Sequence, residues 1–459
     1  MLKGEKRDLD LLNFLKNNVV AATGCTEPIA VAYAVSLAYH ALFQDEITLD
    51  AYNNFKFSKE VPTINLKNLK LIKIEVDQNV YKNAYSAIIP GTDNLQGIEV
   101  AAALALYLNP KDKLNIFNNI EKPSIDKIGQ ILENKIIEVS HIEGSPNDYS
   151  LKILISLQYI YHERLKTSRV KIYEKHDNVV EISVDGATLY KELEDQINNE
   201  SENLSINLEE ILKSVETASD LVLEEVNRGI LMNLKIANEG LTKPYGLNIA
   251  KFLKQIFKEE GCSESILSEI RTKVASAGDA RMGGSNLPVM TSSGSGNMGI
   301  TAIIPVVIMG ERKYIPQTKI QRAVLLSHII TSIADKYHGH LSLLCGAAIK
   351  AGFGVAASIT YLLNGSHSQI NNAINLMAAN NVGFLCDGAK PGCALKISTA
   401  AGIATECALI ALQDNLINSD NGIIFEKSDE TLKGIGNISR ALYPFNKEII
   451  DLLEKSDKN

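Results

Sequence analysis

The chain has 459 residues, of which 45% are hydrophobic and 22% charged, and its net charge is −8. This length exceeds what one compact core usually holds, so we expect two folded domains rather than a disordered chain. No block of lysine or arginine interrupts the acidic balance, which argues against nucleic acid or an anionic membrane as a partner.

The hydrophobic pattern in chain order predicts an α+β fold. Residues 1–18 mix both charge signs without an apolar run, so we expect no signal peptide and a cytoplasmic protein. In the first part we expect helices at 9–15 and 28–43, and strands at 69–76, 151–157, 169–175 and 179–184. The last two strands flank a short polar turn and predict a hairpin.

The polar segment 196–207 is the best linker candidate, and the hydrophobic pattern of the sequence changes after it. Long helical patterns follow at 208–226, 245–258, 316–336, 370–379 and 393–413. We therefore expect a mixed α/β N-terminal domain with antiparallel strands over residues 1–200. A largely helical C-terminal domain is expected over residues 208–459.

The stretch 341–363 is long and apolar enough to span a membrane, and Lys350 is its only charge. Its three glycines and several small polar residues dilute the hydrophobicity. We therefore expect a buried pair of core helices rather than a membrane span.

The first candidate for chemistry is Cys25, in the block Gly24-Cys25-Thr26-Glu27-Pro28. Thr26 can cap the following helix, and Pro28 suits its first turn. Cys25 would then lie just before a helix N-terminus, where the macrodipole stabilises a thiolate. A small buried residue before a helix is the alternative.

Residues 278–299 form a glycine-rich segment that contains GxGxxG. Pro288 precedes it and no acidic residue follows at the required distance, so we do not expect a dinucleotide site. Its backbone and side-chain donors would suit a carboxylate, with Arg281 as a clamp. A tight connection between helices is the alternative. The candidate side chains are Ser292, Ser293, Ser295, Asn297 and Arg281.

His338 and His340 come shortly before Cys345. They could serve as ligands or proton carriers, or simply as the polar end of the preceding helix, which is the interpretation the pattern favours.

Cys345, Cys386 and Cys393 are separated by 41 and 7 positions. This spacing matches neither zinc knuckles nor ferredoxin runs. The last two lie in a loop with Asp387 and Lys390, and such loops often present ligands. Both a cluster site and buried structural cysteines remain open. Cys262 and Cys407 lie on helical faces and are expected to pack.

Five blocks together resemble the L-cysteine desulfidase family, which is related to the α-chain of iron–sulfur L-serine dehydratases. They are GCTEPIAVAYAVSLA, IPGTDNLQGIEVAAAL, DARMGGSNLPVMTSSGSGNMGI, LCGAAIKAGFG and CDGAKPGCALK. The resemblance implies an oxygen-labile [4Fe–4S] cluster with three protein ligands. It also implies conversion of L-cysteine to pyruvate, ammonia and hydrogen sulfide without pyridoxal phosphate.

Carried over to this sequence, the resemblance places cluster ligands at Cys25, Cys345 and Cys386, with Cys393 as an alternative to Cys25. It supports the serine–glycine block as a carboxylate site. Lys390 and His340 are candidate bases. L-Serine is the alternative substrate, and a structural metal or redox-sensing protein is the alternative class. We expect a small amino-acid substrate. The sequence leaves the oligomeric state undecided, with a homodimer as one alternative.

Overall fold

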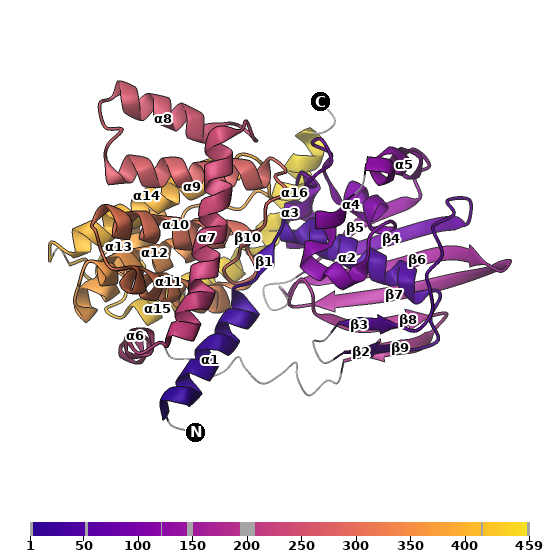
Figure 1. Ribbon diagram of the computed structural model, residues 1–459, viewed down its shortest axis with the longest axis horizontal. Coiled ribbons are helices and arrows are strands. Elements are labelled where there is room, and N and C mark those ends of the chain that lie inside the picture. The colour runs from indigo at the N-terminus through magenta and orange to yellow at the C-terminus, as the bar shows by residue number, and fades with distance from the viewer. Residues whose placement is uncertain are drawn as a thin grey trace. The chain divides into compact units, whose positions relative to one another are not determined.

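The structure is a computed structural model, and it describes residues 3–50, 54–120, 122–144, 150–192, 207–414 and 416–456. It divides into two compact units (Figure 1). Unit 1 joins residues 1–22, 205–386 and 390–442, and unit 2 joins 23–204, 387–389 and 443–459. Unit 1 is largely helical and unit 2 mixes helices with a sheet, so the predicted α+β class is confirmed.

The two units do not follow the expected division at residue 200 throughout. The first helix belongs to unit 1, because Leu11 and Leu15 are buried in its hydrophobic core. The last helix belongs to unit 2, where it packs on α3 (Gln78–Tyr85). Most of the expected linker lies outside the described residues.

Unit 2 contains eight strands among its described residues. They are β2 (Ile47–Leu49), β3 (Phe55–Phe57), β4 (Leu69–Asp77), β5 (Ile137–Ile142), β6 (Lys152–Tyr161), β7 (Arg164–Tyr173), β8 (Val179–Val184) and β9 (Ala187–Lys191). Its helical segments are α2 (Thr26–Ala41), α3, α4 (Ile98–Ala105), η1 (Pro110–Asn119), α5 (Lys122–Glu133), η3 (Tyr443–Phe445) and α16 (Asn446–Ser456).

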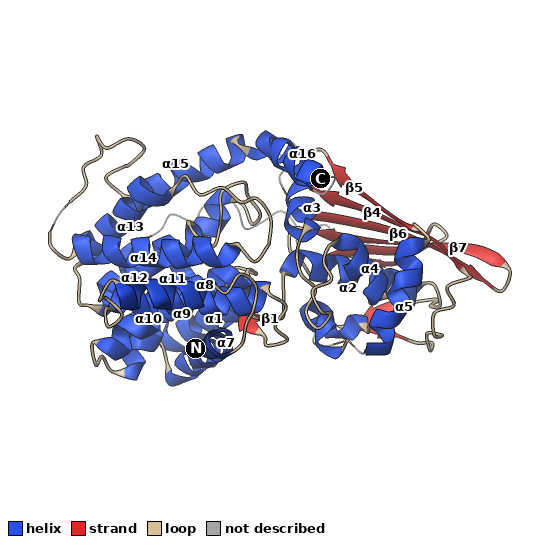
Figure 2. Cartoon of the chain, turned by 90° about the horizontal axis from the view of Figure 1, so that it is seen from above, coloured by secondary structure: helices blue, strands red, loops and turns tan. Residues whose placement is uncertain are grey.

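Six of these strands form one sheet in the order β5-β4-β6-β7-β8-β9. Its pairs are antiparallel, including the predicted β7–β8 hairpin, except that β4 and β5 are parallel. A parallel pair needs a long crossover, which α3, α4 and α5 provide. Figure 2 shows helices gathered along one side of this sheet.

Alternation along β6 explains which face of the sheet is covered. Ile153, Ile155 and Leu157 are buried, while the residues between them are half-exposed. Since successive side chains of a strand point to opposite faces, one face carries the core. The helix α2, almost wholly buried, lies against β6, β7 and β8. A helix that is apolar all round requires such a buried position.

Unit 1 is built from helices and one short strand pair, β1 (Ala21–Ala22) with β10 (Val289–Met290). Its helices are α1 (Lys3–Asn18), α6 (Leu208–Glu216), α7 (Asp220–Thr242), α8 (Ile249–Glu259), α9 (Ile266–Met282), α10 (Gly296–Arg312), α11 (Gln317–His338), α12 (Lys350–Leu362), α13 (His367–Asn381), α14 (Cys393–Ala411) and α15 (Ser428–Ala441).

Two expected helical stretches of unit 1 are interrupted. The stretch 208–226 is divided between α6 and α7, because Ser219 takes the extended conformation of an N-cap. The stretch 341–363 is not a helix pair, since only Lys350–Leu362 is helical and the residues before it form an irregular segment. This segment contains Cys345.

One helix among the described residues, α14, is long and apolar enough to cross a membrane by length and composition. In the structure α14 packs against α9, α12 and α13, and most of its residues are buried. One face of α14 is therefore covered by other helices of unit 1, while Leu395, Leu409 and Ile410 are exposed.

The close contact between α7 and α9 is possible because residue 240 is a glycine and has no side chain. A Cβ atom there would lie 1.9 Å from the Ser276 carbonyl oxygen. That oxygen belongs to the backbone of a buried helix, so it cannot move aside without shifting α9.

We expect Gly240→Ala to destabilise unit 1 by about 3 kcal/mol or more, the upper range for overpacking. Thermal unfolding of the metal-free protein, followed by circular dichroism, would measure this as a lower midpoint. Gly129→Ala is the control, because no atom lies within 4 Å of its Cβ position in the exposed face of α5. It should gain about 0.5–1 kcal/mol from helix propensity. Equal midpoints for the two variants would contradict the close contact.

Candidate functional site

Two of the candidate cysteines are placed by a short antiparallel contact in unit 1. Leu344 and Leu385 form an isolated bridge. On either side of it, the Cys345 N–H donates to Phe384 O at 2.8 Å, and the Cys386 N–H donates to Leu343 O at 2.6 Å. Because alternate residues of a pair point to one face, Cys345 and Cys386 share the face opposite Leu344 and Leu385.

Cys393 joins this pair as the first residue of α14, and its N–H donates to Lys390 O at 2.9 Å. Burial, together with the neighbouring Cys386 and Cys393, raises the pKa of Cys345 to about 12. Burial also raises the pKa of Cys393, with a smaller contribution from Cys386. The three thiols are thus close enough to influence one another's charge.

Thiolates are common ligands of metal centres, so these three residues are candidate ligands. Among the described residues no group of three histidine, cysteine or carboxylate side chains is arranged to hold a metal ion. Three half-buried thiols would repel one another as thiolates, and a bound cationic centre would remove that penalty. The lysines 390 and 396 also oppose the raised pKa of Cys393.

Cys25 lies in unit 2, and its surroundings differ from those expected. Cys25 itself is the N-cap residue of α2, and Thr26 is the first helical residue, so the prediction that Thr26 caps this helix is wrong. The Cys25 Sγ donates to Glu27 Oε2 at 2.9 Å, and Asn83 Nδ2 donates to Glu27 Oε1 at 2.9 Å.

Glu27 is a buried carboxylate. Burial alone would raise its pKa, but the charge of His176 and the bonds from Cys25 and Asn83 outweigh burial and lower it. The thiol of Cys25 is therefore hydrogen-bonded to an ionised carboxylate.

The serine–glycine segment before α10 is a tight turn. Ser292 and Ser295 exchange two backbone hydrogen bonds of 3.1 Å. The two residues between them, Ser293 and Gly294, have positive φ angles of 45° and 74°. This combination is typical of a type I′ turn, which glycine adopts without strain. Ser295 then caps α10 by accepting a bond from the Met298 N–H.

The predicted carboxylate donors lie in this turn, but most of them already have partners within unit 1. Ser292 Oγ lies 3.0 Å from His328 Nδ1, and Ser293 Oγ lies 2.8 Å from Ser332 Oγ. Asn297 Nδ2 donates to a methionine sulfur, while its Oδ1 is buried without a hydrogen-bond partner among the described residues.

Arg281 is positioned at the N-terminus of α10. It is only 4% exposed, and a Cβ on Gly296 would lie 2.3 Å from its Nε. The guanidinium therefore packs directly on the first residue of α10, where unsatisfied N–H groups and the macrodipole carry positive charge. Two sources of positive potential at one place attract an anion.

The two predicted bases both lie in unit 1. Lys390 is half-buried near Cys393. His340 is in the irregular segment after α11, and its Nδ1 lies 3.1 Å from Asp335 Oδ2. A carboxylate on one ring nitrogen is the arrangement that orients a catalytic histidine.

Lys350, Asp335 and His328 were not singled out as site residues by the sequence, whereas His338 was. Lys350 and Asp335 form a buried ion pair of 2.8 Å, for which the only signal was one charge in an apolar stretch. His328 is fully buried in α11, and no sequence pattern distinguishes it from a core residue. Burial lowers its pKa to about 4. His338 is also buried, and its pKa is lowered to about 3 by burial and by Lys350.

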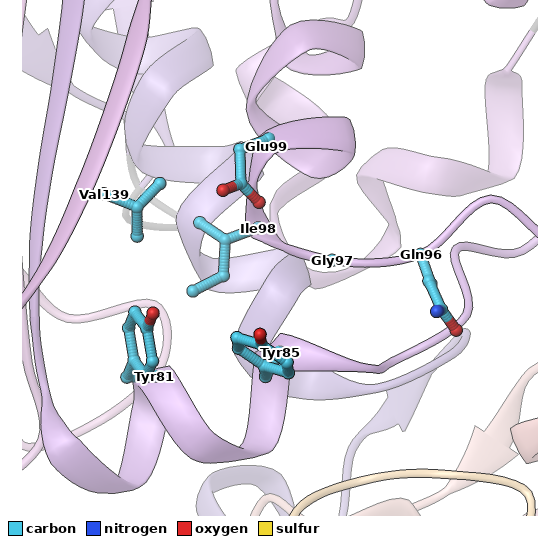
Figure 3. Close-up of a pocket in the computed structure, with 7 residues that line it drawn as sticks. All are labelled: Tyr81, Tyr85, Gln96, Gly97, Ile98, Glu99 and Val139. Carbon is cyan, nitrogen blue, oxygen red and sulfur yellow. The ribbon is translucent and has the colours of Figure 1, made fainter. Parts of the chain in front are cut away.

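Unit 2 carries a separate hollow of about 210 Å³ (Figure 3). Tyrosine rings, an exposed glutamate and a glycine backbone surround it. None of the predicted site residues lines it, so it is distinct from the candidate site. Its lining residues are Tyr81, Tyr85, Gln96, Gly97, Ile98, Glu99 and Val139.

The family model described as serine dehydratase alpha chain matches residues 162–449. Over 441 residues the chain is 35% identical to a UPF0597 protein of Caldanaerobacter subterraneus, covering 95% of both chains. It is 32% identical over 439 residues to a UPF0597 protein of Clostridium tetani, covering 94% of both.

The chain therefore belongs to the serine dehydratase α-chain family. It is a lyase-type enzyme of the iron–sulfur kind that this family represents. The matched residues include Cys345, Cys386 and Cys393, whereas Cys25 precedes them.

The lowered pKa of His328 predicts a loss of stability in acid. In the unfolded chain its imidazole takes up a proton near the ordinary pKa of 6.5, whereas the native site resists protonation down to about 4. The unfolded state therefore gains protons first as the pH falls, which should cost unit 1 about 2 kcal/mol by about pH 5.

Urea unfolding at several pH values would measure this loss, and His328→Asn should reduce it by a similar amount. Above pH 7 wild type and variant should show the same pH dependence. A variant with the full acid sensitivity of wild type would show that His328 is not its source.

Proposed function

We propose that this enzyme is an L-cysteine desulfidase, which eliminates sulfide from L-cysteine to give pyruvate and ammonia. The meeting of Cys345, Cys386 and Cys393 in one unit is the observation that supports this proposal most, because a cluster lyase needs thiol ligands gathered near one substrate. L-Serine is the alternative substrate, and the family match favours it as the second candidate.

We propose Cys345, Cys386 and Cys393 as the cluster ligands, so that Cys393, the alternative to Cys25 in the sequence analysis, takes its place. The three share unit 1 and the region matched by the family model. Cys25 belongs to unit 2, and its thiol is bound to Glu27. The chemistry that a [4Fe–4S] cluster supplies, when one iron has no protein ligand, is that of a Lewis acid for the leaving group.

The residues of the chain would bind and deprotonate the amino acid. Arg281 and the N-terminus of α10 would hold the substrate carboxylate, with the serine turn and Asn297 beside it. His340 would accept the α-proton at Nε2, since its Nδ1 faces Asp335. Lys390 is the alternative base.

Loss of the α-proton and of sulfide from the β-carbon leaves aminoacrylate. This tautomerises to the imine, and water then releases ammonia and pyruvate. The electron pair of the broken C–H bond forms the new double bond while the C–S pair leaves with sulfur. No external oxidant or reductant is needed.

The ligand proposal predicts the iron content of cysteine variants. After anaerobic purification, Cys345→Ala, Cys386→Ala and Cys393→Ala should each lose the cluster, measured as iron and acid-labile sulfide per chain. Cys262→Ala is a matched control and should keep both, because that thiol is half-buried in the turn between α8 and α9 and not on a helical face as expected. Full iron retention in any of the first three variants would remove that cysteine from the ligand set. Cluster loss in Cys25→Ala would restore it to the set.

The substrate proposal predicts anaerobic release of sulfide and pyruvate in equal amounts from L-cysteine. The specificity, measured as kcat/KM, should be higher for L-cysteine than for L-serine. A brown protein that turns over only L-serine would overturn the desulfidase assignment and leave the dehydratase alternative. A colourless protein with zinc and no turnover would overturn both.

A further inference from the structure

Lys350 is a deeply buried charged residue of unit 1, with 1% of its side chain exposed. It is the first residue of α12, where the helix macrodipole disfavours a cation. A lysine is buried only when its charge is compensated. Its position therefore requires an explanation in its partners.

The ammonium of Lys350 has three acceptors for its three protons. Its Nζ donates to Asp335 Oδ1 at 2.8 Å, to Gly339 O at 2.5 Å and to His340 O at 3.3 Å. Two of these are carbonyls just beyond the C-terminus of α11, where positive charge is favoured. Lys350 thus connects the start of α12 to the end of α11, and each of its three N–H groups has an acceptor.

The same ion pair fixes the ring of His340. Asp335 uses Oδ1 for Lys350 and Oδ2 for His340 Nδ1. Burial would raise the pKa of Asp335, but the charges of Lys350 and His340 outweigh it and lower the pKa. An ionised carboxylate can only accept hydrogen bonds, so the proton lies on Nδ1 of His340. In a neutral ring, Nε2 then carries the lone pair.

The surrounding contacts make this assembly rigid. Two carbonyls of the last turn of α11 accept hydrogen bonds from α15, since Arg440 donates to Tyr337 O and Ser439 donates to His338 O. The aliphatic stem of Lys350 packs on Gly346, the residue after Cys345. A Cβ atom added to this glycine would lie 3.5 Å from the Lys350 Cδ and Cε atoms. One buried lysine therefore supports both the His340 segment and the Cys345 segment.

We propose that Asp335 and Lys350 are positioning residues for His340: Lys350 fixes Asp335, and Asp335 holds the Nδ1 proton so that Nε2 is the nitrogen that accepts a proton. This inference rests on the proposed function for its catalytic consequence, but the arrangement of the proton on His340 does not depend on it.

The first test is spectroscopic and uses the full chain without a cluster. Long-range ¹H–¹⁵N spectra of protein labelled at histidine nitrogen report which ring nitrogen carries the proton. His340→Gln identifies the signals of His340 among those of the eight histidines. Wild type should show His340 protonated on Nδ1, and the opposite tautomer in wild type would overturn the proposal without any further variant.

Asp335→Asn should change this spectrum, because its amide can still accept from Lys350 while its N–H₂ cannot accept from His340 Nδ1. We expect the Nε2-protonated ring or a mixture of tautomers. Asp429→Asn is the matched control, since it removes a nearby carboxylate that bonds Tyr337 and Lys433 rather than His340. An unchanged His340 tautomer in Asp335→Asn would refute the proposal that Asp335 holds the proton on Nδ1 of His340.

The second test uses the anaerobic, cluster-loaded enzyme. Asp335→Asn should lower kcat by about 100-fold or more at unchanged iron content and little-changed KM, by analogy with other carboxylate–histidine pairs. Asp335→Glu, which keeps the charge, should recover part of this loss. Loss of iron together with activity would make Asp335 a purely structural residue. If wild type turns over neither L-cysteine nor L-serine, the proposed function fails, while the tautomer measurement still decides the proton arrangement.

Discussion

Two backbone hydrogen bonds hold the candidate site together. They join the segment before α12 to the segment before α14, and they place Cys345 and Cys386 on one face. The helices on either side are packed through small residues, so these loops start from fixed positions. Without this short pairing, two cysteines 41 positions apart in sequence would have no reason to meet. Buried backbone groups need partners, so the same bonds that satisfy the loops also gather the thiols.

Much of the fold could be predicted from hydrophobic periodicity. The alternation in β4 and β6 and the β7–β8 hairpin follow directly from their residues, as do the buried helices α2 and α14. The break between α6 and α7 was missed because Thr217 to Ser219 interrupt the helix without glycine or proline. The irregular segment before Lys350 was missed because its apolar residues resemble a helix, whereas their backbone bonds with a distant segment decide the conformation.

The candidate site was only partly visible in the sequence. The glycine-rich spacing left a tight connection at Ser292 to Ser295 as the alternative to a carboxylate site. It did not indicate that Ser292 and Ser293 would be used by His328 and Ser332. Those partners come from α11, and no local pattern links them to the turn. Lys350 was noted only as the single charge of an apolar stretch, and its counter-ion Asp335 lies in another helix. Long-range pairing of polar groups leaves no periodic signal in a sequence.

The order in which the chain enters its two units has a consequence for synthesis. The first helix needs partners from beyond residue 205, and α16, near the end, completes the unit that begins at residue 23. Unit 1 can therefore close only after residue 205 has been synthesised, and unit 2 only after α16 has been synthesised. Distant contacts of this kind slow folding and leave apolar surface open in the meantime. A metal centre on the thiols of residues 345, 386 and 393 accordingly needs these separate segments of unit 1 to fold together first.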